Sequence, residues 1–189
     1  MPMMKIFWVI SAVLISAIAV LSFFAGLFDN LKITNQTAGP YYLVYRTHRG
    51  SYSGIQFVMG DVYRYMREKK SVTTENGFVI YYDDPEKIQT DSLRSIAGVI
   101  TDSSVVVEEP YKSGLFRKTE ALIGTFPIRS FMSYSIGVYK FYPAMEKKLA
   151  KDKIQLSGPV LEIFDLGKKQ ITYVAPVNQK VSPAPLFSK

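Results

Sequence analysis

The chain has 189 residues and a formal charge of +7, with no cysteine and a single histidine, His48. The missing cysteines exclude disulfides, thiolate zinc sites and a cysteine nucleophile, and one histidine cannot form a histidine metal cluster. We therefore expect no metal site and no bound cofactor. Beside an apolar segment, a basic charge is better matched by anionic lipid headgroups than by nucleic acid, so we expect no nucleic-acid partner.

Residues 6–28 form a run of 23 positions without a charge or a proline. At about 1.5 Å per residue, a helix of this length crosses a hydrocarbon core of about 30 Å. We predict that residues 6–28 are a transmembrane helix that anchors the chain as a single-pass membrane protein. A cleavable signal peptide is the alternative, because Lys5 precedes the run and Ala17-Ile18-Ala19 has the small-x-small form of a cleavage site. The run continues well past that site, which favours an uncleaved anchor.

The charges that flank the run leave the side of the membrane open, because Lys5 on one side faces Asp29 and Lys32 on the other. Residues 29–37 are predicted as a linker. Within them, Asn35-Gln36-Thr37 matches the glycosylation acceptor pattern, and its other interpretation is a polar linker sequence.

Beyond the linker, the sequence contains a weak internal repeat at a shift of 82 positions. Ser51-Tyr52-Ser53 recurs as Ser133-Tyr134-Ser135, and residues 78–83 align with residues 160–165. In each half, the apolar pattern predicts a strand, a helix and two further strands. The predicted elements are 41–46, 53–69, 77–82 and 95–101 in the first half, and 120–126, 135–150, 160–164 and 171–177 in the second.

This pattern predicts an α+β fold in which duplicated βαββ units, spanning residues 38–177, form one pseudo-two-fold antiparallel sheet. Because each helix needs a sheet face to bury its apolar stripe, we expect both helices on one face, with the other face open. Residues 178–189 are predicted as a short tail.

One charged residue, Glu162, interrupts an otherwise apolar strand. Strand side chains alternate between faces, so if Leu161 and Ile163 pack against the helices, Glu162 and Phe164 point to the open face. Two interpretations remain. The carboxylate is either exposed to water, as many strand glutamates are, or it lies in an aromatic pocket where it meets a cation or acts as a base. The 82-residue shift places Phe78, Ile80 and Tyr82 on the same face.

Three strings carry a family resemblance: His48-Arg49-Gly50-Ser51-Tyr52, Tyr81-Tyr82-Asp83-Asp84-Pro85 and the stretch 158–164. Their order and spacing resemble the GyrI-like small-molecule-binding domains, the effector-binding modules of multidrug-responsive bacterial transcription regulators. The resemblance covers about residues 38–177. With the N-terminal apolar run, the chain resembles the membrane-anchored branch typified by the testis-expressed ER-phagy receptor.

The resemblance implies a ligand cleft between the two halves, with the family's strand glutamate at Glu162. In the family this residue contacts cationic ligands, or serves relatives that hydrolyse cyclopropane-bearing toxins. No DNA-binding pattern precedes the domain, so the role of a transcription regulator is not carried over from the family. Phe187 lacks the acidic setting of an autophagy-adaptor motif, so a role in selective autophagy is not carried over either. The candidate ligand-binding residues are Glu162, Tyr82, Phe78, Ile80, Phe164, Tyr52 and Tyr134.

Three functions follow from these expectations. The first is a membrane-anchored protein that binds small hydrophobic, aromatic or cationic ligands. The second is a hydrolase of strained, cyclopropane-type electrophiles, with Glu162 as general base and a nearby tyrosine as acid. The third is a membrane adaptor or receptor with a vestigial pocket, for which the sequence indicates no particular protein partner.

The anchor can be tested by the mass of the mature protein. We expect the purified full-length protein to retain residues 6–28, because the apolar run is longer than the hydrophobic region of an ordinary signal peptide. Intact-mass spectrometry measures this directly. A mature N-terminus near Val20 would instead identify a signal peptide cleaved after Ala17-Ile18-Ala19.

Overall fold

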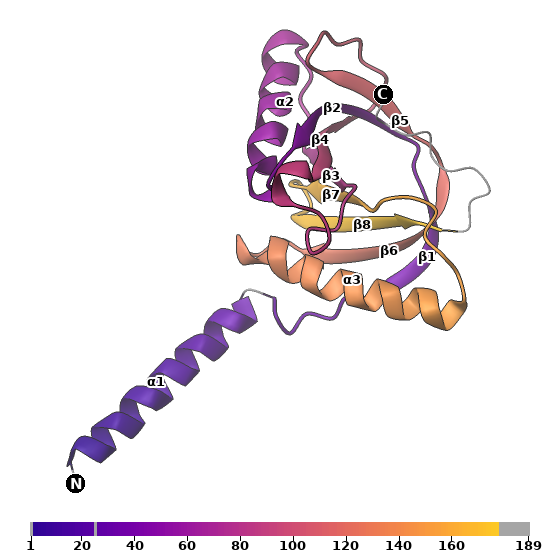
Figure 1. The fold of residues 1–189 in the computed structure, drawn as a ribbon. Helices are drawn as coiled ribbons and strands as arrows, with labels where there is room; N and C mark the ends of the chain where they lie inside the picture. Colours follow the sequence, from indigo (N-terminus) through magenta and orange to yellow (C-terminus); the bar gives the residue numbers. More distant parts are fainter. Residues whose placement is uncertain (1, 25, 178–189) are drawn as a thin grey trace.

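The computed structural model describes residues 2–24 and 26–177, so position 25 and the predicted tail at 178–189 lie outside the described residues. Helix α1 (Pro2–Phe24) precedes an eight-stranded antiparallel sheet that carries the helices α2 (Ile55–Lys69) and α3 (Met132–Asp152). The predicted α+β class is confirmed. Figure 1 shows the sheet curling into a half-barrel, with α2 and α3 on its outer side and α1 projecting away from it.

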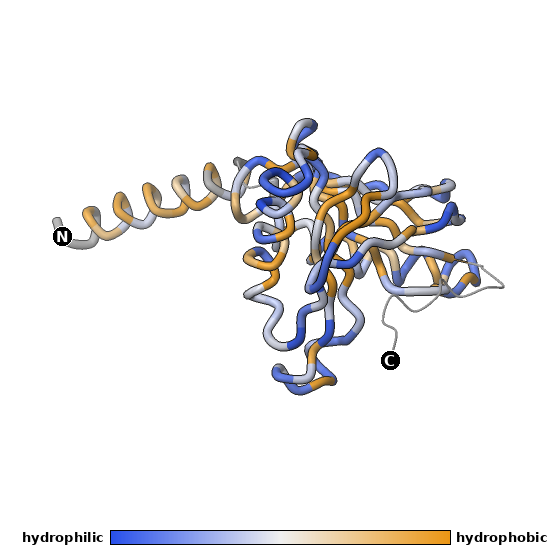
Figure 2. The backbone as a smooth tube through the Cα atoms, turned by 90° about the horizontal axis from the view of Figure 1, so that it is seen from above, coloured by the Kyte–Doolittle hydropathy of each residue, from blue (hydrophilic) through white to orange (hydrophobic). Residues whose placement is uncertain are grey.

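Helix α1 carries apolar residues along its whole length, as the hydropathy colours of Figure 2 show. It ends at Phe24 because Gly26 adopts a φ of +85°, a left-handed conformation that glycine takes without strain. The Leu27 amide then donates to the Ser22 carbonyl at 3.0 Å, as in a Schellman C-cap. The predicted helical run of 6–28 is therefore too long at this end. Within the ranges that the structure describes, no helix combines the length and the apolarity that a membrane crossing requires.

The order of the strands is symmetric about the centre of the sheet. From edge to edge it runs β1-β6-β8-β7-β3-β4-β2-β5, so each strand of one half has a counterpart at the same distance from the centre. Such an order is what two copies of one unit related by a two-fold axis produce. The bounds are β1 Ile33–Ala38, β2 Tyr41–Arg49, β3 Asn76–Tyr81, β4 Arg94–Thr101, β5 Lys112–Phe116, β6 Thr119–Pro127, β7 Leu161–Asp165 and β8 Gln170–Pro176.

The sequence pattern misses the two edge strands, β1 and β5. Strand β1 lies largely inside the predicted linker of 29–37 and pairs with β6, while β5 pairs with β2. Each edge strand thus belongs to one half and pairs with the other half. The sequence of β1, ITNQTA, is polar and its side chains are mostly exposed. Because backbone pairing rather than side-chain burial forms this strand, its sequence carries no alternating apolar signal.

The two faces of the sheet carry separate cores. Val79 packs on the outer face in one core with Ile55 of α2 and Phe141 of α3. Phe78 and Leu161 belong to a second core on the inner face of the curl, which among the described residues contains strand side chains and no helix side chain.

Two expectations are therefore wrong. Leu161 and Ile163 do not pack against the helices but lie in the inner core, so Glu162 and Phe164 point to the helix-covered face. The second face is not open, because the curl of the sheet brings its side chains together and buries them.

Gly98 of β4 marks the closest approach of two paired strands. A Cβ at this position would overlap the carbonyl oxygen of Val44 in β2, and a paired strand backbone has little room to move. We expect Gly98→Ala to lower the free energy of unfolding by about 3 kcal/mol or more. Gly60→Ala is the control: nothing lies within 4 Å of its Cβ position in α2, and alanine is favoured over glycine in a helix by about 1 kcal/mol. Urea unfolding compares them, and wild-type stability of Gly98→Ala would contradict this close approach.

Candidate functional site

A cavity of about 820 Å³ lies between α2 and α3, above the central strands β3 and β7. Its walls are mostly apolar and aromatic, and its floor is the outer face of the sheet. The main lining side chains are Tyr52, Ile55, Met59 and Tyr63 from the α2 side, Tyr134, Val138 and Tyr139 from α3, and Val79, Tyr81, Glu162 and Phe164 from the strands. The cavity therefore lies at the junction of the two halves of the repeat.

Tyr52 and Tyr134 hold equivalent places at the starts of the two helices. The Tyr52 ring packs on Tyr81 of β3 with 4.6 Å between ring centroids, and the Tyr134 ring packs on Phe164 of β7 at 5.6 Å. The Tyr52 hydroxyl also donates to the Asp83 carbonyl at 2.8 Å. Both predicted tyrosines therefore line the cavity, each against the end of a central strand.

These ring contacts correct the register of the repeat. Tyr81 and Phe164 are 83 positions apart, one more than the shift of 82 that the sequence indicates. A one-residue change moves every side chain of a strand to the opposite face. Phe78 and Ile80 therefore lie in the inner core and not in the cavity.

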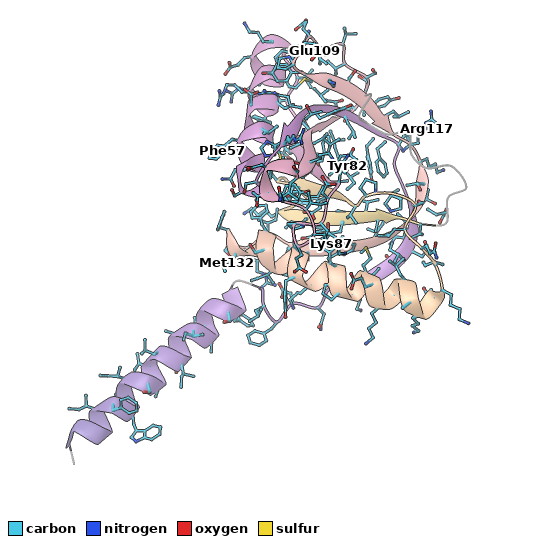
Figure 3. The ribbon with its side chains drawn as sticks, in the orientation of Figure 1. Phe57, Tyr82, Lys87, Glu109, Arg117 and Met132 are labelled. Carbon is cyan, nitrogen blue, oxygen red and sulfur yellow. The ribbon has the colours of Figure 1, made fainter. Side chains whose placement is uncertain are left out.

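Tyr82 also packs against the inner core, and Figure 3 shows it within the curl of the sheet. Three of the seven predicted ligand-binding residues (Phe78, Ile80 and Tyr82) are thus absent from the cavity lining, and Tyr52, Tyr134, Glu162 and Phe164 belong to it. The cavity also contains residues outside the predicted set, and two of them, Val79 and Tyr81 of β3, would have been identified by the corrected shift.

Glu162 lies at the floor of the cavity and is buried, with 2% of its surface exposed. Its partners on the two neighbouring strands are Val79 of β3, across the centre of the sheet, and Tyr173 of β8. The Tyr142 hydroxyl of α3 donates to its Oε1 at 3.1 Å. Burial raises the pKa of Glu162 to about 7, and the hydrogen bond from Tyr142 opposes this rise by stabilising the charged form. The carboxyl group therefore titrates near neutral pH.

Three phenols surround this carboxyl group. Burial, and then the negative charge of Glu162, raises the pKa of Tyr142, Tyr81 and Tyr173, so all three stay protonated at neutral pH. The Tyr173 hydroxyl is buried and has no hydrogen-bond partner among the described residues. Phenols so placed can donate hydrogen bonds to the carboxylate or to a ligand.

The arrangement offers one acid–base group near neutrality, hydrogen-bond donors and a large aromatic surface. Within the residues that the structure describes, no group of three or more histidine, aspartate and glutamate side chains is placed to hold a metal ion. Glu162 can accept a proton or attract a cation, and the rings can stack on a planar or apolar molecule. This is the chemistry of a binding pocket for an organic molecule.

The pKa of Glu162 makes the stability of the fold depend on pH. The folded state holds the proton up to about pH 7, whereas an exposed carboxyl group releases it near 4.5. Since the folded state binds the proton more tightly, the free energy of unfolding should fall between these pH values, by up to about 3 kcal/mol, and then level off. The Glu162→Gln variant has no carboxyl group at this position and therefore does not show this fall in the free energy of unfolding. Its stability relative to wild type should rise from pH 5 to pH 8.

Urea unfolding of both proteins at pH 5 and pH 8 measures the effect. Glu75→Gln, which changes an exposed carboxylate at the same cavity, is the matched control and should follow wild type at both pH values. A difference between wild type and Glu162→Gln that stays constant with pH would mean that Glu162 titrates like an exposed residue.

No protein-family model matches the chain, and no curated protein matches it in sequence. Solved structures do resemble its fold. The crystal structure of the EcmrR C-terminal domain is 10% identical, with a TM-score of 0.56, and the match covers 79% of this chain and 98% of that domain. EcmrR in a cryo-EM structure with DNA is 10% identical, with a TM-score of 0.57, covering 93% of this chain and 69% of that one. A hydrolase from Listeria innocua is 8% identical, with a TM-score of 0.47, covering 80% and 95%.

At these identities, the likeness to EcmrR establishes the fold alone. The fold expected from the resemblance is confirmed by it, since the match covers 98% of the EcmrR domain. The comparisons give no support for the membrane-anchored branch. The chain therefore has the fold of the EcmrR C-terminal domain.

Proposed function

We propose that the domain binds small apolar or aromatic molecules in the cavity between α2 and α3, and that it prefers those with a positive charge. The observation that carries this proposal is the burial of Glu162 beneath an aromatic cavity. Among the described residues, no lysine or arginine forms an ion pair with this carboxylate. A buried charge without a partner is costly, and a cationic ligand would supply that partner.

The shape of the cavity supports the same class of ligand. Its volume of about 820 Å³ falls in the range of roughly 300–1,000 Å³ that drug-sized molecules occupy. Tyr52, Tyr134 and Phe164 offer ring faces to an apolar body, while Glu162 offers a polar end. A cavity of this size argues against a vestigial pocket, which would be filled by its own side chains.

A hydrolase is the second candidate, favoured by the contact between Glu162 and Tyr142. A carboxylate with a pKa of about 7 is a competent general base at neutral pH, and a phenol 3.1 Å away can serve as the acid. Such a pair could activate water against a strained electrophile in the cavity. In that case Glu162→Gln would abolish turnover and leave binding of the electrophile intact.

We also propose that α1 holds the domain at a membrane as an N-terminal anchor. Phe7, Trp8, Ile15 and Ile18 are all more than half exposed on α1. A helix that is apolar around its circumference requires an apolar environment, either a protein core or lipid. The intact mass of the mature protein tests the first requirement, which is that the helix is retained.

Glu162→Gln separates charge recognition from pocket shape. Glutamine keeps the size and the hydrogen bond but loses the charge, so affinity for a lipophilic aromatic cation should fall by about 1–3 kcal/mol. A neutral aromatic molecule of the same size should bind almost unchanged. In wild type, affinity for the cation should also fall as the pH drops below about 7, because Glu162 takes up a proton.

Calorimetric titration of both ligands against wild type, Glu162→Gln and Glu75→Gln measures these effects. The Glu75 variant controls for a general change in the charge of the cavity, since Glu75 also lines it but is exposed. Equal losses for the cation and the neutral ligand would mean that the Glu162 variant damages the pocket. No loss for either would contradict the role of Glu162 in binding.

A further inference from the structure

Exposed apolar residues surround the open end of the cavity. Phe131 and Tyr139 line the cavity, yet they are 78% and 77% exposed, and Leu166 in the turn after β7 is 58% exposed. Phe57 of α2 is 74% exposed and follows Gln56, which lines the cavity from the opposite helix. We call Phe57, Phe131, Tyr139 and Leu166 the apolar rim. Isolated exposed apolar residues are ordinary, but a group around one opening marks an interaction surface.

The segment that follows α1 is fastened beside this rim. The Asp29 carboxylate forms an ion pair with Arg129 at 2.9 Å, and its backbone carbonyl accepts a hydrogen bond from the Lys140 ammonium at 2.7 Å. Arg129 lies two residues before Phe131, and Lys140 directly follows Tyr139. The first half of α3 and the residues just before it thus hold the end of the α1 segment and carry two residues of the rim.

The chain between α1 and this attachment is short. Asp29 lies five residues beyond Phe24, the last residue of α1, and its amide donates to the Gly26 carbonyl at 3.0 Å, so a compact turn links the end of α1 to the attachment. The headgroup layer on each side of a bilayer is roughly 5–7 Å thick. With α1 in the hydrocarbon, the attachment and the adjacent rim reach the depth of the headgroups, where tyrosine and other aromatic residues are enriched.

We propose that the apolar rim rests on the surface of the membrane that holds α1, so that the cavity opens toward the bilayer. This inference rests on the proposed binding function and on the proposed anchor. Figure 3 shows Phe57 and Met132, at the beginning of α3, projecting on the side of the domain from which α1 departs. The labelled part of the rim and the apolar helix therefore lie on the same side of the domain, and lipid is the partner that we assign to both.

This orientation narrows the class of ligand. A molecule that enters from the bilayer partitions there first, with its apolar body among the acyl chains and its charge at the headgroups. A lipophilic amine has both properties. Its apolar part would pass along the rim between α2 and α3, and its ammonium group would meet the Glu162 carboxylate at the floor of the cavity. Such a path avoids transfer of the apolar part through bulk water.

The cysteine-free sequence allows single positions to be labelled without further changes. Full-length variants Phe57→Cys and Phe131→Cys, each carrying an environment-sensitive dye, would be reconstituted in phosphatidylcholine vesicles with brominated acyl chains. Both positions are highly exposed, so folding should tolerate the label. Val106→Cys is the matched control: it is apolar and 85% exposed, in the loop with Glu109 that lies at the end of the domain away from α1. Trp8, the single tryptophan, reports the position of α1 in the same vesicles.

We expect bromine to quench Trp8 and the dyes at positions 57 and 131, and to leave the dye at position 106 unchanged. Quenching of Trp8 with full emission from positions 57 and 131 would place α1 in the bilayer but the rim away from it, which overturns this inference alone. A dye at 57 or 131 that is shielded from water but not quenched would indicate a protein partner or a second copy, and would also overturn it. An unquenched Trp8 would contradict the anchor itself, and the inference with it.

Discussion

The antiparallel pairing of β3 with β7 joins the two halves of the domain, and the position of the cavity depends on it. This pairing places Val79 directly opposite Glu162 at the centre of the sheet. Helices α2 and α3 cover the sheet on either side of this line, and the space between them lies above it. A shift of one residue in the pairing would turn Glu162 into the inner core, where no cavity receives it. The register of one strand pair therefore decides whether the carboxylate can meet a ligand.

Burying Glu162 lowers the stability of the fold in the absence of a ligand. Burial raises the pKa of this carboxyl group and makes its charged form costly above neutral pH, and the hydrogen bond from Tyr142 offsets only part of that cost. An apolar residue at this position would remove that cost. Binding sites commonly retain such a cost because the ligand offsets it, and the loss of stability is then a consequence of function.

The sequence predicted the regular elements well, because α2, α3 and six of the strands bury apolar side chains with helical or alternating spacing. It also identified Glu162, since a lone charge in an apolar strand stands out without knowledge of the fold. Position along the chain could not decide which face of the sheet carries the cavity. Two repeats whose loops differ in length are not related by one constant shift. Tyr52 and Tyr134 are 82 positions apart, whereas Tyr81 and Phe164 are 83 positions apart. Tyr142 carried no signal, because its contact with Glu162 depends on how α3 lies over the sheet.

The two halves share a fold but fill the space around Glu162 differently. In the first half, Val79 pairs with Ala97, and a bulky Ile55 at the start of α2 belongs to the same core. In the second half, Glu162 pairs with Tyr173, and Gly137 of α3 leaves room for the Tyr173 hydroxyl, which a Cβ at position 137 would overlap. In the first half, the helix residue is large (Ile55) and the strand residue is small (Ala97). In the second half, the helix residue is small (Gly137) and the strand residue is large (Tyr173). The volumes balance while the polarity does not, because the carboxylate and the Tyr173 phenol lie on one side of the two-fold axis. Val79 of β3 and Glu162 of β7 face each other in the floor of the cavity, so the carboxylate lies on one side only and directs the charge of an amphiphilic ligand toward β7.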